Sequence, residues 1–208
     1  MKLKVTTKHH SGKATIFKNQ FLESLTKSNL KVNIVYGIVI LTMIYIALFK
    51  IKIHFFTFFG IFTFAILFWT FAEYILHRFL FHWISDNKLI QRFHFIMHGS
   101  HHLYPRDTDS ILMPPVPGLI MTVFLFLIFY LFFSIIGISE ITWAFYPGFF
   151  LGYILYSFLH RATHVNRPPK KFKYLWKHHI IHHYKYPQKA FGDSTTFWDK
   201  VFGSMPPQ

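Results

Sequence analysis

Ten of the fifteen histidines in this chain fall into four short groups, whose spacing is suited to metal binding. Two groups have the pattern HxxHH, one is HxxxxH and one is HxxxH. Side chains three and four residues apart lie on one face of an α-helix, so most of these imidazoles can point the same way. Neutral imidazole is a ligand for Zn, Cu, Fe and Ni. The candidate metal ligands are His77, His82, His98, His101, His102, His160, His164, His179, His182 and His183.

Ten imidazoles are too many for one metal ion, so the pattern predicts a dinuclear centre with about five ligands for each metal. The HxxxxH pair needs a special geometry, because His77 and His82 would lie roughly 140° apart around an ideal helix. They can share a metal only if the helix loosens between them. The other five histidines are assigned non-ligand roles: His9, His10, His54, His94 and His178.

Four apolar stretches, at about 32–49, 53–72, 116–138 and 141–159, are close to the roughly 20 residues that cross a bilayer. They predict an all-α integral membrane protein with about four transmembrane helices. Two short connections would pair these helices as hairpins, which places the N-terminus, the segment 73–115 and the C-terminal tail on one face. Because most Lys and Arg residues are on that face, we expect it to be cytoplasmic and to carry a histidine-rich helical cap.

The charge pattern further divides the chain and excludes one class of partner. The net charge is +14, and residues 1–31 hold seven lysines and one acidic residue. We therefore expect a basic cytoplasmic arm at 1–31 and a membrane domain at 32–208. Because the basic residues flank apolar spans, they indicate anionic lipid headgroups as partners, not nucleic acid. The sequence has no cysteine, which excludes disulfides, and its polar first thirty residues do not resemble a signal peptide.

The order and surroundings of the histidine groups resemble the membrane fatty acid hydroxylase superfamily, which also contains sterol desaturases. The similarity is greatest to the fatty acid 2-hydroxylase branch, and it extends from about residue 66 to residue 203. It rests on the segments 73–82 (EYILHRFLFH) and 94–102 (HFIMHGSHH), and on PRD at 105–107, MPP at 113–115, GDST at 192–195 and WD at 198–199.

This resemblance implies two ligand sets. One metal would be held by His77, His82, His98, His102 and His182, and the other by His101, His160, His164, His179 and His183. Members of the superfamily are described as non-haem di-iron enzymes, so iron is expected for activity, with zinc an alternative occupant in purified protein. Zinc is redox-inert and outcompetes Fe(II) for nitrogen ligands. Glu73, Asp107, Asp193 and Asp199 are candidates to accept hydrogen bonds from the ligating imidazoles.

The implied function is O2-dependent hydroxylation of lipid acyl chains, at C-2 by analogy with the branch. Many relatives carry a fused cytochrome b5 domain, which this arm is too short to contain, so we expect a separate electron donor of the cytochrome b5 or ferredoxin type. The chain also departs from the branch at Ser157, where a carboxylate is usual, and at Ser110, where an arginine is usual. The second difference would affect how a substrate headgroup is recognised.

Three alternatives stay open. A sterol or carotenoid oxidase or desaturase of the same superfamily would use the same histidines, although the PRD and MPP segments favour the acyl reading. A non-catalytic membrane metal-binding protein would also be rich in histidine, but a transporter would spread its ligands along a path through the membrane. A haem carrier would need axial histidine pairs instead of triplets. The bacterial inner membrane is the favoured location, or the endoplasmic reticulum if the source is eukaryotic.

Overall fold

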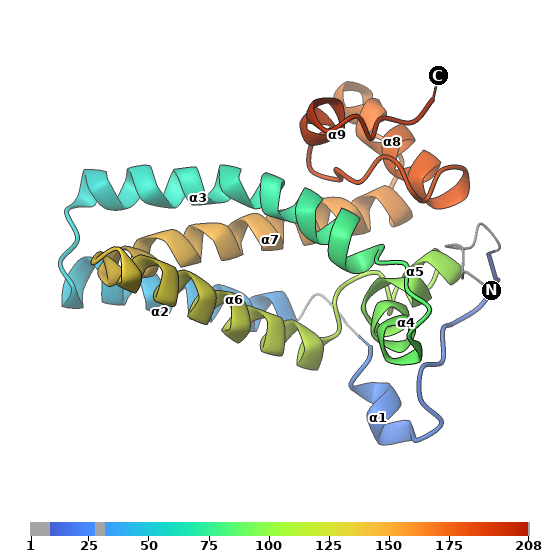
Figure 1. The fold of residues 1–208 in the computed structure, drawn as a ribbon, viewed down its shortest axis with the longest axis horizontal. Coiled ribbons are helices and arrows are strands. Elements are labelled where there is room, and N and C mark those ends of the chain that lie inside the picture. Colours follow the sequence, from blue (N-terminus) through green and yellow to red (C-terminus); the bar gives the residue numbers. More distant parts are fainter. Residues whose placement is uncertain (1–8, 28–31, 208) are drawn as a thin grey trace. The chain divides into compact units, whose positions relative to one another are not determined.

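The computed structural model describes residues 9–27 and 32–207, and every regular element in these ranges is a helix (Figure 1). The chain forms two compact units. The membrane unit contains residues 32–70 and Val116–Leu155, and the histidine unit contains residues 9–27, Phe71–Pro115 and 156–207. The predicted all-α class is therefore confirmed.

The predicted basic arm is only partly described. Residues 1–8 and 28–31, with the predicted boundary after residue 31, lie outside the described residues. The described part, 9–27, belongs to the histidine unit and contains the short helix α1 (Gln20–Ser24). The separation of an arm from a membrane domain stays a prediction.

Three helices of the described chain are long and apolar enough to cross a membrane, which identifies an integral membrane protein. The first is α2 (Val32–Tyr45), which a π-helical turn, η1 (Ile46–Lys50), continues. The second is α3 (Phe55–Ile75) with its π-helical continuation η2 (Leu76–Phe81). The third is α6 (Pro115–Ile135), whose apolar side chains are largely exposed, as expected for contact with lipid.

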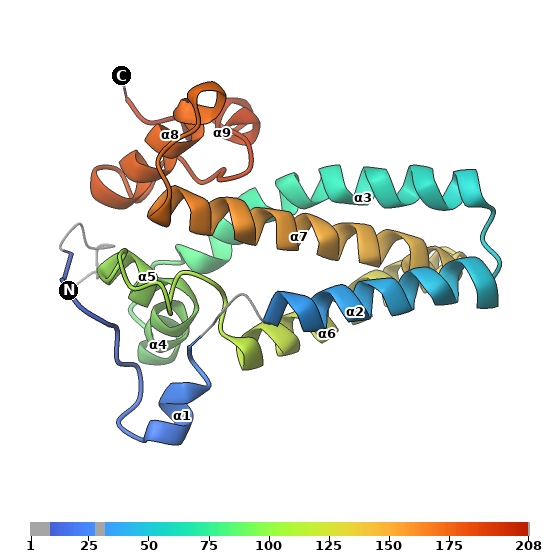
Figure 2. The same ribbon diagram turned by 180° about the vertical axis from the view of Figure 1, so that it is seen from behind.

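A fourth crossing was expected at 141–159, and the structure has a helix there, α7 (Thr142–Val165). Its composition is not apolar enough to count with the other three. Its lower apolarity fits its position beside the other helices of the membrane unit, which Figure 2 shows from behind. Aromatic contacts from Phe150, Phe145 and Tyr146 join α7 to α2, α3 and α6 respectively. A helix that packs on protein from several sides can be less apolar than one that faces lipid.

Two glycines of α7 allow the closest of these approaches. A Cβ on Gly148 would lie 2.3 Å from the carbonyl oxygen of Phe62, and one on Gly152 would lie 2.4 Å from Cβ of Trp69. Both partners are on α3. The spacing GxxxG lets two helix backbones approach closely, which is a common way to pack helices in membranes.

The histidine unit is built from short helices and from the ends of α3 and α7. Its other helices are α4 (Lys88–His94), the π-helical turn η3 (Phe95–Gly99), α5 (Ser100–Leu103), α8 (Lys173–Tyr184) and α9 (Phe197–Val201). The N-caps of α1 and α4 are both asparagines, whose side chains accept hydrogen bonds from backbone N–H groups of the first turn.

Candidate metal centre

The structure brings nine of the ten predicted ligands into two compact groups of histidines. Within each group, one ring nitrogen of every histidine lies within 4.8 Å of one from each other member. The five-histidine group consists of His77, His82, His98, His102 and His182, and the four-histidine group of His101, His160, His164 and His179. All of these side chains are buried except His164, which is partly exposed. The composition of the two groups is that of a dinuclear metal site.

The HxxxxH pair is brought together by the local loosening that its spacing required. The turn η2 is π-helical, and the backbone N–H of His82 donates to the carbonyl of His77, five residues earlier, at 3.1 Å. The wider turn places the two rings 4.9 Å apart between centroids. A second π-helical turn, η3, precedes α5 and contains His98. Single π-helical turns occur frequently at functional sites.

The distances inside the five-histidine group are those expected around a bound cation. His98 Nε2 lies 3.1 Å from His77 Nε2 and 3.0 Å from His102 Nε2. His182 Nε2 lies 3.1 Å from His82 Nε2 and 3.2 Å from His102 Nε2. Ligands held at roughly 2.0–2.1 Å from one ion, at tetrahedral or octahedral angles, are about 2.9–3.4 Å apart. The observed separations fall in that range.

The four-histidine group has similar internal distances. His160 Nε2 lies 3.1 Å from His101 Nε2, and His179 Nε2 lies 2.7 Å from His164 Nε2. Burial lowers the pKa of the His101 and His164 imidazoles well below the usual value, with neighbouring histidines adding to the shift. These rings are therefore neutral near pH 7, which is the form that binds metal.

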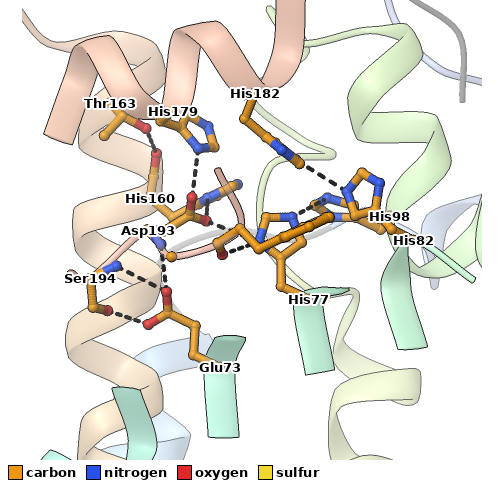
Figure 3. Close-up of polar contacts among 12 residues, drawn as sticks. Glu73, His77, His82, His98, His160, Thr163, His179, His182, Asp193 and Ser194 are labelled. Carbon is orange, nitrogen blue, oxygen red and sulfur yellow. Dashed lines mark hydrogen bonds and ion pairs between the residues drawn. The ribbon is translucent and has the colours of Figure 1, made fainter. Parts of the chain in front are cut away.

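His77 and His182 are oriented from outside by carbonyl groups of one loop. His77 Nδ1 donates to the carbonyl of Phe191 at 2.6 Å, and His182 Nδ1 donates to the carbonyl of Lys189 at 2.7 Å. A proton on Nδ1 leaves the lone pair on Nε2, which faces the other histidines (Figure 3). Lone pairs that converge in a buried space repel one another unless a proton or a cation lies between them, so this arrangement fits a metal ion.

The four-histidine group is oriented by a carboxylate instead. Asp193 Oδ2 accepts from His160 Nδ1 and Oδ1 accepts from His179 Nδ1, both at 2.8 Å. Burial opposes ionisation of Asp193, but these two rings hold its pKa well below the ordinary value. Asp193 is in turn held by Glu73, which accepts from the backbone N–H groups of Asp193 and Ser194 at 2.7 and 2.9 Å and from the hydroxyl of Ser194 (Figure 3).

His183, the tenth predicted ligand, lies close to the four-histidine group. It is not a member of the group, whose ring nitrogens all lie within 4.8 Å of one another. Its ring centroid is 4.5 Å from that of His179, 4.7 Å from that of His101 and 4.8 Å from that of His164. Both of its ring nitrogens are buried, and neither has a hydrogen-bond partner among the described residues. A buried polar group without a partner is energetically costly, and a bound metal ion would remove that cost. His183 therefore also has a nitrogen available to bind a metal.

Sequence analysis could name carboxylates as partners of the ligand imidazoles, but it could not name the backbone carbonyl groups that orient two of them. Of the four acidic candidates, Asp193 contacts ligand imidazoles directly, and Glu73 contacts Asp193. Asp199 accepts from His178 at 2.9 Å, and Asp107 accepts from the backbone N–H of Ala14 at 2.9 Å. The carbonyls that orient two ligands have no side-chain signal, so no sequence pattern could have found them.

One histidine of the N-terminal arm, assigned a non-ligand role from the sequence, packs against the helices of the histidine unit. His9 is partly buried, its Nδ1 lies 3.0 Å from the carbonyl oxygen of His102, and its ring lies 4.3 Å from that of Tyr184. The next residue, His10, donates its backbone N–H to the carbonyl of Leu103 at 2.8 Å. The arm thus packs on helix α5, a long-range contact that a polar stretch of sequence does not reveal.

Taken together, the fold and the site define an all-helical integral membrane protein with a buried two-part histidine centre. The chain belongs to the fatty acid hydroxylase family, because the sequence pattern of that family matches residues 62–204. This agrees with the resemblance drawn from the histidine motifs.

Individual relatives support the same assignment. Fatty acid 2-hydroxylase of Mus musculus is 38% identical over 156 residues, which cover 73% of this chain and 41% of the mouse protein. Ceramide very long chain fatty acid hydroxylase of Schizosaccharomyces pombe is 35% identical over 210 residues, covering 95% of this chain and 56% of the yeast protein. The chain therefore spans about half the length of these curated relatives.

A solved structure is similar as well. It is the structure of full length scs7p, in which only the hydroxylase domain is visible, and it is 33% identical in sequence to this chain with a TM-score of 0.82. The match covers 95% of this chain and 74% of that one. The similarity confirms the helical fold together with the family.

Proposed function

We propose that this protein hydroxylates lipid acyl chains with O2 at a dinuclear centre. The observation that carries the proposal is the convergence of imidazole ring nitrogens in two buried groups, at the spacing of ligands around a metal ion. The ligands would be the nine grouped histidines and His183. A haem carrier needs only two axial ligands, so it does not account for these groups.

Iron is the metal we assign for activity. Two iron ions bound here would supply the redox chemistry that activates O2 and breaks a C–H bond. Zinc fits the same nitrogen ligands but has no redox chemistry, so a zinc-loaded sample should be inactive. The chain itself supplies neutral imidazoles, the carboxylate of Asp193 and the carbonyl groups that keep Nδ1 protonated.

The proposed substrate is an acyl chain, and the proposed position is C-2. The names of the relatives support both: one is a fatty acid 2-hydroxylase and another a ceramide very long chain fatty acid hydroxylase. Those names also favour acyl lipid over sterol or carotenoid, and the word ceramide in one of them supports a sphingolipid as a candidate carrier. The reaction converts R–H, O2, two electrons and two protons into R–OH and water.

The two electrons require a donor, for which we propose a separate protein of the cytochrome b5 or ferredoxin type. We also propose that the histidine unit faces the cytoplasm, because the positively charged residues of the chain are concentrated in its segments. The bacterial inner membrane, or the endoplasmic reticulum in a eukaryote, stays a prediction from the sequence.

The test is lipid mass spectrometry on cells that express the chain under 18O2, beside cells that express His182→Ala. We expect one 18O atom in a hydroxyl on acyl chains, at C-2 by fragmentation, and none in the variant. Co-expression of a cytochrome b5 and, separately, of a ferredoxin with their reductases supplies the donor. An iron-loaded, folded protein that produces no labelled lipid with either donor would refute the proposal.

A further inference from the structure

The loop at residues 189–192 has two sets of hydrogen bonds, which run in opposite directions. Its carbonyl groups, at Lys189 and Phe191, accept from the imidazoles of His182 and His77. Its backbone N–H groups, at Phe191 and Gly192, point the other way and donate to the carboxylate of Asp199, at 2.9 and 2.8 Å. The loop therefore lies between two members of the five-histidine group and one buried aspartate.

Asp199 is fully buried and uses both of its oxygens twice. Oδ1 accepts from the backbone N–H of Phe191 and from the hydroxyl of Ser204, the latter at 2.7 Å. Oδ2 accepts from the backbone N–H of Gly192 and from Nε2 of His178, the latter at 2.9 Å. Four donors on one buried carboxylate hold it, and the loop with it, in a single position.

The loop is held in a conformation that needs such support. Ala190 has a φ of 61°, in the left-handed region that residues with a Cβ rarely adopt, and its N–H donates to the carbonyl of Ser204 at 2.8 Å. A Cβ on Gly192 would lie 2.2 Å from the carbonyl oxygen of Thr195. Backbone of this kind persists where the surrounding structure fixes it.

We infer that Asp199 is a positioning residue for the metal in the five-histidine group, and that it acts through the loop at residues 189–192. It fixes the two carbonyls that keep His77 and His182 protonated on Nδ1, with Nε2 toward the metal. In the four-histidine group, His160 and His179 donate instead to the side chain of Asp193, the residue after the loop, whose backbone N–H is held separately by Glu73. The inference rests on the proposed binding of metal by the five-histidine group.

The substitution Asp199→Asn should disturb the loop whichever way the amide is turned. An asparagine has one acceptor oxygen, and each carboxylate oxygen of Asp199 now faces a backbone N–H. The NH2 group must therefore point at the N–H of either Phe191 or Gly192. Side chains can change their roles at this site, since a hydroxyl can accept and an imidazole can change tautomer, but a backbone N–H cannot.

The experiment measures cobalt(II) binding to the purified full-length chain, by its visible d–d absorption, in two backgrounds. His164→Ala weakens the four-histidine group and leaves the five-histidine group as the tighter site, while His98→Ala does the reverse. In the His164→Ala background, we expect Asp199→Asn to weaken cobalt binding by about 10–100-fold, the usual effect of losing the partner of a metal ligand, and to shift the absorption bands. In the His98→Ala background, we expect little change in affinity or spectrum.

Asp107→Asn is the matched control, because it removes a buried carboxylate from the same unit at a site that does not contact the loop. It should leave cobalt affinity unchanged in both backgrounds. If Asp199→Asn does not fold, Ser204→Ala replaces it, since it removes one of the four donors and should produce a smaller loss restricted to the same background.

Two outcomes are decisive in different ways. If the His164→Ala protein binds no cobalt at all, then the five-histidine group is not a metal site and the proposed function fails with it. If that protein binds cobalt and Asp199→Asn changes neither affinity nor spectrum, or weakens both backgrounds equally, the inference about Asp199 is wrong while the proposed centre stands.

Discussion

Replacing Asp193 with asparagine should disable the four-histidine group selectively. The carboxylate accepts one hydrogen bond from His160 and one from His179, each at 2.8 Å. An asparagine can accept only one of them, and its NH2 group must face the other ring. That ring would then move its proton from Nδ1 to Nε2, where it blocks metal binding. His77 should be affected little, because its Nδ1 lies 4.0 Å from Asp193 and donates to the carbonyl of Phe191.

The expected loss of metal affinity follows from the loss of one correctly oriented histidine ligand in the four-histidine group. Changing the hydrogen-bond partner of a metal-ligating histidine typically costs 10–100-fold in affinity, which corresponds to about 1.4–2.7 kcal/mol. The assay loads the wild type and Asp193→Asn with metal, dialyses them against increasing concentrations of a chelator, and measures metal per chain by mass spectrometry. We expect the variant to lose one ion at a free-metal concentration about 10–100-fold higher than the wild type does, and to keep the other.

The design separates this effect from a general loss of stability. Asp107→Asn, run in parallel, removes another buried carboxylate and should release its metal like the wild type. Loss of both ions together from Asp193→Asn, with the control unchanged, would contradict the assignment of Asp193 to one group. Retention of both ions at wild-type affinity would refute the argument from tautomers altogether.

Three further predictions concern stability. Gly152→Leu should destabilise the protein by ~3 kcal/mol or more in a detergent thermal melt, because its Cβ would lie 2.4 Å from that of Trp69; Gly60→Ala, with open space around it, should not. Asp107→Asn should lower stability near pH 7 and have no effect in acid, because burial raises the pKa of Asp107 but its hydrogen bonds and the nearby Lys27 outweigh burial and lower it. The stability that the ionised Asp107 contributes is therefore present above its unfolded-state pKa and disappears as the pH falls through its folded-state pKa. Thermal melts of both proteins from pH 7 to pH 3 test this. Removing metal should lower the melting temperature, since a ligand at a thousand times its Kd stabilises by about 4 kcal/mol; an unchanged melt would show that no bound metal had been removed.

The sequence predicted the helical class and the gathering of the histidines because both depend on local patterns. Apolar runs identify membrane helices, and HxxHH on a helix places its imidazoles on one face. The spacing of His77 and His82 required a loosened helix if both were to bind one metal, but the sequence did not show whether the helix loosens. The structure has a π-helical turn between them. Whether these side chains bind metal stays a prediction.

Other features could not be predicted because they depend on long-range packing. The contact between His9 and the carbonyl of His102 joins residues 93 positions apart. The carbonyls of Lys189 and Phe191 acquire their role only when the loop is fixed by Asp199. Helix α7 lies where a fourth crossing was expected, and its packing on three helices of the membrane unit, which a sequence does not show, allows it to be less apolar than the other three.

The order of the histidine groups along the chain determines when the centre can be completed during synthesis. Members of both groups occur before α6, at residues 77–102, and after it, at residues 160–183. The partners that orient them, Asp193 and Asp199, are translated later still. Neither group can therefore be complete until the last apolar helix has left the ribosome. Each group can be completed only after translation of nearly the whole described chain, and a nascent chain stalled before His160 would hold four members of the five-histidine group but only His101 of the four-histidine group.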